Sequence, residues 1–457
     1  MLSKAKLVRF CGAPLVKGGV RVQDNGGSFK LVYGPADKPK SMKETIIYSV
    51  QWLFIMFYPV VWGYSIVGLG LQLSGDEMAS YMARVVLMIG VCTLAQVLAG
   101  HRLSMVSGPN IIPSLAIVAA FTIGGKEYAL QSFNAYIIAG IVVAILGWLG
   151  IISMIGKVWT PLVLGSMIMM VGLATSTTGV SLIASDGATA PFAVGIILAL
   201  ICGYISIKGR GMLATIPVLI TIVLGYLVFM VMGNFDWELV NSMPLIMAPS
   251  IFPYGLIMPP LDLIITMILV NIFSAVNLYG NVQGYSSIIG VKSDSATEKR
   301  YFTIFGAVEG ILTGIFGVPS YVAYGENIGI VLLTRVAARI FIVIASVVCI
   351  VLSFFGPIGG LMAAMPKPVA GAVLLGVAST LIGTGASTWT QGNIFQTREI
   401  FITGFSVFLA LGLAALPQEF YSALPNLVGT VLKTTVIMVI ILTILMEQVI
   451  FKKSSAN

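Results

Sequence analysis

Long apolar runs, separated by short charged or Gly/Pro-rich breaks, fill most of the chain after its first 46 residues. A hydrocarbon core about 30 Å thick requires roughly 20 apolar residues in helical form, and most of the runs approach that length. The pattern predicts fourteen helices, at residues 47–71, 79–100, 105–124, 134–155, 160–182, 191–207, 213–232, 261–289, 302–317, 326–338, 339–356, 366–387, 399–415 and 428–451. We therefore predict an all-α membrane protein.

Two of these runs, residues 162–181 and 368–387, resemble each other at a constant offset, and a proline precedes each copy. The identical pairs are Val163/Val369, Gly165/Gly371, Val171/Val377, Thr178/Thr384, Gly179/Gly385 and Ser181/Ser387. The pairing of a fifth with a twelfth helix implies seven helices in each half. Because seven is odd, the two halves must run in opposite directions, which is the inverted-repeat plan of secondary transporters.

The composition excludes several classes of protein. Hydrophobic residues make up 58% of the chain and charged residues only 9%, whereas a soluble chain carries about 25% charged residues. The net charge of +8 lies mostly in the N-terminal tail rather than on a folded face, which disfavours a nucleic-acid partner. One histidine and four distant cysteines offer no metal-ligand spacing, so we expect no metal and no cofactor.

The basic tail at residues 1–46 predicts the orientation. It has no apolar core of the kind that marks a cleaved signal peptide. With the N-terminus inside, 21 Lys and Arg residues fall on the cytoplasmic side and 4 on the opposite side. The positive-inside rule therefore places both termini, including the tail at 452–457, in the cytoplasm. We expect the protein to lie in the cell membrane.

Two Gly/Pro interruptions occupy corresponding places in the two halves, in the third and tenth helices. They are Ser107–Pro113 and Gly317–Gly329, and each is predicted to form an extended stretch followed by a half-helix that starts near Pro109 or Gly325. Polar side chains at membrane depth are costly and usually functional. Asn110, Glu326 and Asn327 lie in these breaks, which makes the breaks the candidate binding site.

The run from Ala323 to Arg335, AYGENIGIVLLTR, resembles the signature of the nucleobase–ascorbate transporter family, also called nucleobase:cation symporter-2. Its Glu and following Arg are most similar to the bacterial uracil and xanthine permeases. Tyr48–Phe57 resembles the first helix of that family, and 161–173 and 366–375 resemble its fifth and twelfth helices. The resemblance extends over residues 45–450.

This resemblance implies a fold of fourteen helices in two inverted seven-helix repeats, with half-helices 3 and 10 broken at mid-membrane. Helices 1–4 and 8–11 would form a core domain at residues 47–155 and 259–356. Helices 5–7 and 12–14 would form a gate domain at residues 156–232 and 357–451. A homodimer through the gate domain is also implied.

By the same resemblance, Glu326 would anchor the substrate, main-chain groups near Ile111 and Gly325 would complete the polar contacts, and Asn277 would face the substrate from helix 8. Two family positions differ here: Asn277 stands where members carry a glutamate, and Trp52 where they carry a histidine. Asn281 stands at the second polar position of helix 8. We interpret the rest of the aromatic stretch 52–58 as packing or lipid-facing surface.

The resulting hypothesis is a secondary active transporter for a purine or pyrimidine nucleobase such as uracil or xanthine. Its coupling cation would be H⁺, with Na⁺ and uncoupled exchange left open. Glu326 and the additional carboxylate Glu309 are the proton-carrying candidates. The alternative is an anion exchanger or facilitator of the same fold, although the carboxylate of Glu326 repels anions. An enzyme is not expected, because the spans contain no nucleophile–base pair, metal set or phosphate-binding loop.

Overall fold

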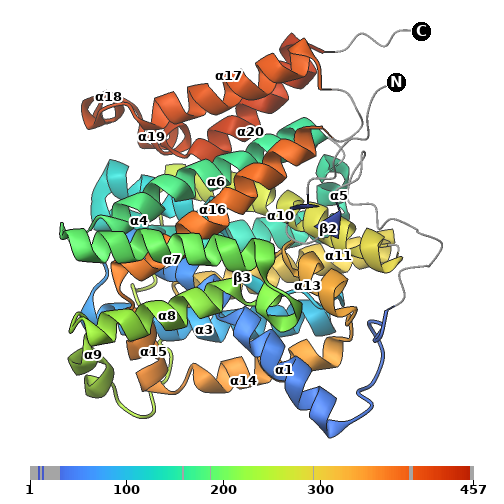
Figure 1. The fold of residues 1–457 in the computed structure, drawn as a ribbon. Coiled ribbons are helices and arrows are strands. Elements are labelled where there is room, and N and C mark those ends of the chain that lie inside the picture. Colours follow the sequence, from blue (N-terminus) through green and yellow to red (C-terminus); the bar gives the residue numbers. More distant parts are fainter. Residues whose placement is uncertain are drawn as a thin grey trace, which may run out of the picture.

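The computed structural model describes residues 31–156, 159–185, 187–291, 293–390 and 395–452, and the backbone of strands β1 (Arg9–Phe10) and β2 (Ala13–Pro14). Almost everything described is helical (Figure 1). The first half contains α1 (Met42–Met56), α2 (Tyr58–Trp62), the π-helix η1 (Gly63–Gly68), α3 (Gly75–Leu98), β3 (Ser107–Pro109), α4 (Ile111–Leu149), α5 (Ile151–Ile155), α6 (Pro161–Ile183), α7 (Thr189–Lys208), the 3₁₀ helix η3 (Gly211–Thr215), α8 (Pro217–Val231) and α9 (Trp237–Ser242). The second half contains α10 (Leu261–Ile289), α11 (Ser295–Ile304), the π-helix η4 (Phe305–Leu312), α12 (Thr313–Ile315), β4 (Tyr321–Ala323), α13 (Asn327–Thr334), α14 (Arg339–Leu352), α15 (Gly356–Ala363), α16 (Lys367–Trp389), α17 (Thr397–Ala414), α18 (Gln418–Ser422), α19 (Asn426–Lys433), α20 (Thr435–Leu445) and the π-helix η5 (Met446–Ile450).

Eight helices among the described residues are long and apolar enough to cross a membrane. A ninth span results if α19 and the following helix, which meet at 86°, are counted together. Most of two predicted helices, 105–124 and 134–155, lies in the single element α4, which is interrupted at Gly125. The first predicted helix begins too early, because residues 107–109 form β3, and the end of the second is the separate helix α5. Gly125 has φ 78° and ψ −174°, a backbone conformation that essentially only glycine adopts. The break between the two predicted helices is therefore one glycine rather than a loop.

The predicted helices 302–317 and 326–338 are less regular than expected. The first consists of α11, the π-helix η4 and the short α12, and the second is the eight-residue α13. Strand β4 lies between them and takes residues that a continuous span would need. The interruption leaves α13 too short to span a membrane, whereas α11, η4 and α12 follow one another without a gap over residues 295–315.

The two copies of the sequence repeat pack against each other as α6 and α16, which lie side by side in Figure 1. A Cβ atom added at Gly371 would lie 2.5 Å from the carbonyl oxygen of Gly179, and one at Gly385 would lie 2.7 Å from that of Gly165. The repeat equates Gly165 with Gly371 and Gly179 with Gly385. Exchanging the two copies therefore exchanges the two contacts, as a twofold axis between α6 and α16 requires. Small residues that allow such close backbone approach are typical of membrane helix pairs.

Replacing Gly371 by alanine tests this contact. Because the new methyl group would meet the backbone of α6 rather than a flexible side chain, we expect a loss of about 1–3 kcal/mol in unfolding free energy. Gly404→Ala is the matched control, since a Cβ at Gly404 in α17 meets nothing within 4 Å and alanine has the higher helix propensity. Thermal unfolding of both variants in detergent should show a lower midpoint only for Gly371→Ala. Equal midpoints would contradict the packing.

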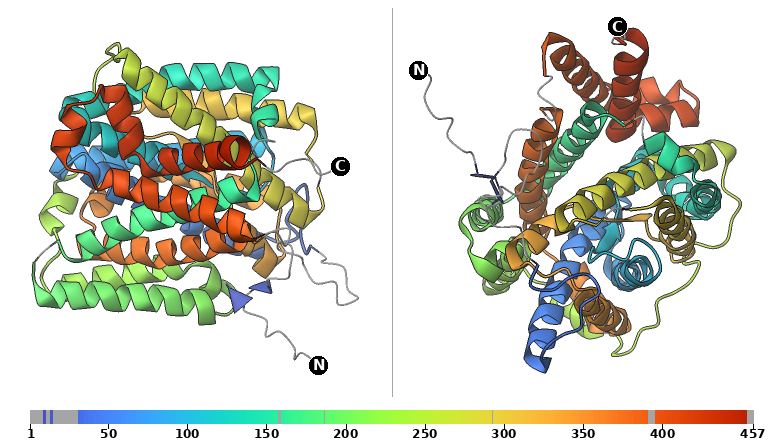
Figure 2. Two further views of the ribbon diagram at one scale, coloured as in Figure 1. Left: turned by 90° about the horizontal axis from the view of Figure 1, so that it is seen from above. Right: turned by 90° about the vertical axis from the view of Figure 1, so that its right-hand side faces the viewer.

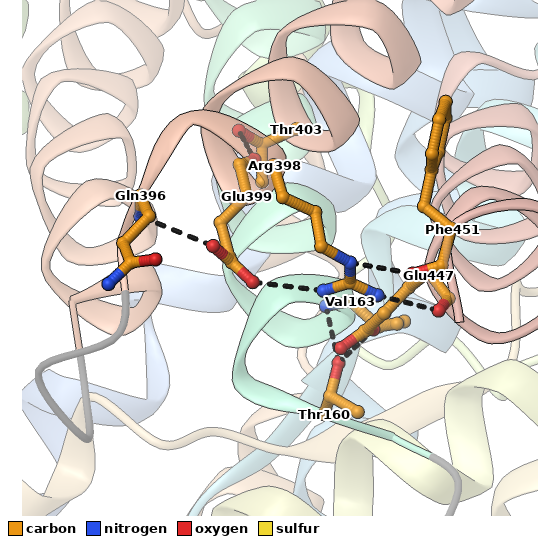
Figure 3. A network of polar contacts seen from close by, with 8 residues as sticks. All are labelled: Thr160, Val163, Gln396, Arg398, Glu399, Thr403, Glu447 and Phe451. Carbon is orange, nitrogen blue, oxygen red and sulfur yellow. Dashed lines mark hydrogen bonds and ion pairs between the residues drawn. The ribbon is translucent and has the colours of Figure 1, made fainter. Parts of the chain in front are cut away.

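The C-terminal helices α17 to α20 gather on one side of α6 (Figure 2). A polar network links the start of α17 and η5 to the start of α6 (Figure 3). Arg398 forms an ion pair with Glu399 at 2.9 Å and donates to the carbonyl oxygens of Phe451 at 2.6 Å and Glu447 at 2.8 Å. The Thr160 hydroxyl, at the start of α6, donates to the Glu447 carboxylate at 2.5 Å. These bonds hold α6, α17 and η5 together.

Strands β3 and β4, called the crossing strands below, pair antiparallel, with Gly108 opposite Val322. Helix α4 begins two residues after β3, and α13 begins four residues after β4. Both predicted breaks therefore contain an extended stretch followed by a helix. The pairing satisfies backbone groups that would otherwise be buried without partners, because all six strand residues are buried.

Candidate functional site

Glu326 lies between β4 and α13, at the point where the crossing strand becomes a helix. Its side chain is exposed and forms no hydrogen bond or ion pair with another residue in the described part of the chain. The carboxylate is close enough to Tyr58 and Tyr324 to act electrostatically on both phenol groups. An acceptor without an internal partner among apolar helices is available to a ligand.

Tyr58 and Tyr324 form an aromatic wall beside this carboxylate. Their rings meet edge to face with centroids 6.0 Å apart. The Tyr324 hydroxyl is buried and donates to the carbonyl oxygen of Pro109 at 2.7 Å, which fixes its ring against β3. Tyr58 is half-buried at the start of α2. The sequence interpretation of 52–58 as packing surface missed Tyr58, whose only signal was a tyrosine before a proline inside the first span.

Two glycines allow the strands to approach their neighbours. A Cβ atom at Gly325 would lie 2.7 Å from Oδ1 of Asn281, and one at Gly108 would lie 2.5 Å from the Cβ of Pro59 and 2.9 Å from the Tyr324 hydroxyl. A larger residue at either position would push apart the elements that surround Glu326. Gly325, a predicted site residue, is thus placed beside the site by close packing.

Helix α10 presents two asparagines one turn apart, on the same face. Asn281 donates from Nδ2 to the carbonyl oxygen of Ala323 at 2.8 Å, so it fastens β4 to α10. Asn277 is half-buried, and no hydrogen bond joins its side chain to another described residue. The two side-chain amides therefore differ in availability. The amide of Asn281 already bonds the main chain of β4, whereas the amide of Asn277 is available to a ligand.

Asn110 and Asn327, two further site residues predicted from the breaks, accept hydrogen bonds from main-chain N–H groups. Asn110 caps α4 by accepting from the N–H of Ile112 at 3.1 Å, while its buried Nδ2 donates to no described residue. Asn327 accepts from the N–H of Val106 at 2.6 Å and so links α13 to the segment before β3. Ile111 is half-buried at the first position of α4. Asn110 and Asn327 position the two helix starts in this geometry.

Glu309 lies in the π-helix η4 and is fully buried, with 0% exposure. Its Oε2 accepts from Nε2 of Gln96 on α3 at 2.7 Å, and its Oε1 accepts no hydrogen bond from a described residue. Ser107, the first residue of β3, lies beside the carboxylate. Glu309 is therefore connected to the crossing strands rather than to the lipid-facing surface.

Trp52, the remaining predicted site residue, is buried in α1 with 2% exposure. No hydrogen bond or ring contact joins it to Glu326 or Asn277 among the described residues. Tyr58, six positions later in the same span, is close enough to Glu326 to interact with it electrostatically.

The chemistry of this arrangement suits a planar, polar heterocycle. An ionised carboxylate accepts strong, directional hydrogen bonds from ring N–H groups, and an amide such as Asn277 offers one acceptor and two donors. Aromatic rings beside them provide an apolar surface for the ring faces.

Comparisons with known proteins agree with this chemistry. A family model described as "Permease family" matches residues 43–419. The chain is 26% identical over 398 residues to the uracil permease of Bacillus caldolyticus, covering 85% of this chain and 89% of that one. It is 24% identical over 390 residues to the xanthine permease of Bacillus subtilis (strain 168), covering 82% and 87%. Among solved structures, the transmembrane domain of the cyanobacterial bicarbonate transporter BicA is similar in fold, with a TM-score of 0.55 and 13% identity over 83% of this chain and 97% of that one.

Proposed function

Since the chain belongs to this permease family and is a multi-pass membrane protein, we propose that it transports a purine or pyrimidine nucleobase across the cell membrane. The relatives named above are permeases, which are transporters and not enzymes. The observation that carries the proposal is the exposed carboxylate of Glu326, which has no internal partner among the described residues and lies beside Tyr58 and Tyr324.

In the proposed binding mode, Glu326 accepts hydrogen bonds from ring N–H groups of the base, and Asn277 reaches it from α10. Backbone groups near Gly325 and Ile111 complete the polar contacts. Tyr58 and Tyr324 cover the apolar part of the site. A base that lacks the matching N–H would leave the carboxylate unpaired, and sites of this kind strongly reject such analogues.

In the proposed transport cycle, the chain has fourteen helices in two inverted repeats. The core at 47–155 and 259–356 moves against the gate at 156–232 and 357–451, and so exposes the site to each side in turn. The reciprocal glycine contacts between α6 and α16 support the twofold relation that this plan needs. Both termini are proposed to be cytoplasmic, from the distribution of Lys and Arg.

The cation that drives uptake is proposed to be H⁺. Glu309 supports this proposal, because it is a buried carboxyl group with one oxygen that bonds no described residue. It lies beside Ser107 of β3, and β3 pairs with β4, the strand that leads to Glu326. Anion exchange by the same fold is the weaker candidate. A carboxylate at the site repels anions, and the likeness to the bicarbonate transporter extends to the fold alone.

Uptake of a panel of radiolabelled bases into a permease-deficient bacterium tests the function. We expect at least one of uracil, xanthine and uric acid to accumulate, and an uncoupler to prevent its accumulation because the proton gradient is then lost. The empty vector is the control, and replacing Na⁺ in the medium separates the two coupling cations. Absence of uptake for every base, in a strain where the protein reaches the membrane, would contradict the proposal.

A further inference from the structure

A polar cavity lies away from Glu326, on the face that also carries residues 31–40. Its volume is about 270 Å³, far more than the roughly 10–15 Å³ that a single water needs. The loop after α3, the second half of α10, helix α11 and the first residue of α14 surround it, and Pro35 closes one side. None of these elements contributes a side chain to the proposed nucleobase site except α10.

The lining of this cavity is cationic. Arg102, Arg300 and Arg339 converge on it from three different elements, and its lining contains no carboxylate among the described residues. Arg300 donates from Nε to the carbonyl oxygen of Gly100 at 3.0 Å and from Nη2 to the Thr297 hydroxyl at 3.4 Å. Arg339 donates from Nε to the carbonyl oxygen of Pro35 at 3.0 Å. These bonds orient two guanidinium groups and leave most of their N–H donors for a ligand. Arginines clustered in this way are typical of sites that recognise anionic oxygen groups.

One acidic group outside the lining, Asp294, interacts with the cluster but is also engaged in capping a helix. Asp294 interacts electrostatically with Arg300, but its carboxylate caps α11 by accepting from the N–H of Thr297 at 2.8 Å. Hydrogen bonding to Thr297 lowers the pKa of Asp294. Burial and the like charge of Arg102 lower the pKa of Arg300. Arg102 and Arg300 therefore repel each other, and a bound anion would relieve that repulsion.

Two buried donors in the same lining have no partner. Nε2 of His101 and the hydroxyl of Ser293 form no hydrogen bond to a described residue, although His101 is only 4% exposed. Nδ1 of His101 accepts from the N–H of Leu103 at 3.0 Å, so the ring proton is on Nε2. Burial lowers the pKa of His101 to about 3, which keeps the ring neutral and this tautomer fixed near neutral pH. Buried donors without partners are rare in folded proteins, and these two are available to a ligand.

We propose that this cavity binds a phosphate group, held by Arg102, Arg300 and Arg339 with Nε2–H of His101 and the hydroxyl of Ser293 as further donors. A phosphate offers several oxygen acceptors in a tetrahedral arrangement, which matches donors that converge from separate elements. A chloride ion or a single carboxylate would satisfy fewer of them. The phosphate belongs either to a small soluble ester or to the headgroup of an anionic lipid, because the cavity opens at the protein surface.

Binding to the purified full-length protein tests the proposal. In lipid-free detergent, calorimetry and thermal unfolding are measured with inorganic phosphate, pyrophosphate and a nucleoside monophosphate, with sodium chloride at equal ionic strength as reference. In phosphatidylcholine nanodiscs, unfolding is compared with and without phosphatidylglycerol. Arg102→Gln removes one charge from an exposed side chain that lines the cavity, and Ser293→Ala removes the free hydroxyl.

Arg335→Gln is the matched control, because Arg335 is also exposed and also has a positive φ, 59° against 62° for Arg102, but does not line the cavity. We expect a phosphate compound to bind the wild type and the control with equal affinity. Arg102→Gln should weaken that binding about tenfold or more, and Ser293→Ala should weaken it less. Nucleobase uptake by Arg102→Gln should remain at the wild-type level, which shows that the variant is folded.

A response to phosphatidylglycerol alone, lost in Arg102→Gln, would assign the phosphate to a lipid headgroup. A response to the soluble compounds would assign it to a small ester. If sodium chloride produces the same stabilisation, or if Arg102→Gln binds as the wild type does, the cavity is not a phosphate site. None of these outcomes depends on which nucleobase is transported.

Discussion

Replacing Glu326 by glutamine is expected to weaken binding of the transported base by about 10- to 100-fold. A hydrogen bond to a charged group contributes about 1.5–3 kcal/mol, and each 1.4 kcal/mol corresponds to a factor of ten in affinity. The side chain of Glu326 forms no hydrogen bond or ion pair with another described residue, so the substitution breaks no internal side-chain bond. Calorimetry on the purified protein, with the base identified by uptake, measures the effect.

Glu127→Gln is the matched control for this prediction. Glu127 is an exposed glutamate in α4, and its replacement also removes one negative charge. We expect its affinity for the base and its unfolding temperature to equal those of the wild type. An unchanged affinity in Glu326→Gln would remove Glu326 from the site, and a lowered unfolding temperature would show that its role is structural.

The two breaks were predictable because glycine, proline and polar residues clustered at membrane depth are poorly compatible with a continuous apolar helix. The sequence located an extended stretch and a helix start in each, and the structure has them at β3 with α4 and at β4 with α13. The pairing of the two strands was not predicted. Strand register depends on residues more than 200 positions apart, and neither three-residue strand carries an alternating pattern of its own.

The roles of individual site residues were less accessible from the sequence. Asn327 and Asn277 are both amides within apolar runs, yet Asn327 accepts from the backbone of Val106 at 2.6 Å, whereas no hydrogen bond occupies Asn277 among the described residues. The difference comes from tertiary contacts across the crossing strands. Tyr58 was missed for the same reason, because a tyrosine in an apolar stretch looks the same whether it faces lipid or Tyr324.

Replacing Glu309 by glutamine is expected to abolish accumulation of the base against its gradient while exchange of bound base continues. The glutamine oxygen can still accept from Gln96, so the packing of η4 on α3 is kept, but an amide cannot carry a proton. A charged carboxylate with one unpartnered oxygen in an apolar interior is costly, and a bound proton removes that cost. Uptake and counterflow in proteoliposomes with an imposed pH gradient measure the two activities separately.

Two further variants distinguish proton transfer from a structural role of Glu309. Glu309→Asp keeps a carboxyl group and should retain part of the accumulation, whereas a purely steric role would make it as defective as Glu309→Gln. Asn277→Glu adds a carboxyl group on α10, next to the proposed base, and should make uptake more dependent on pH. Concentrative uptake by Glu309→Gln would show that another group carries the proton. Since Glu326 is then the remaining candidate near the crossing strands, the same assay on Glu326→Gln at saturating base would decide between the two carboxylates.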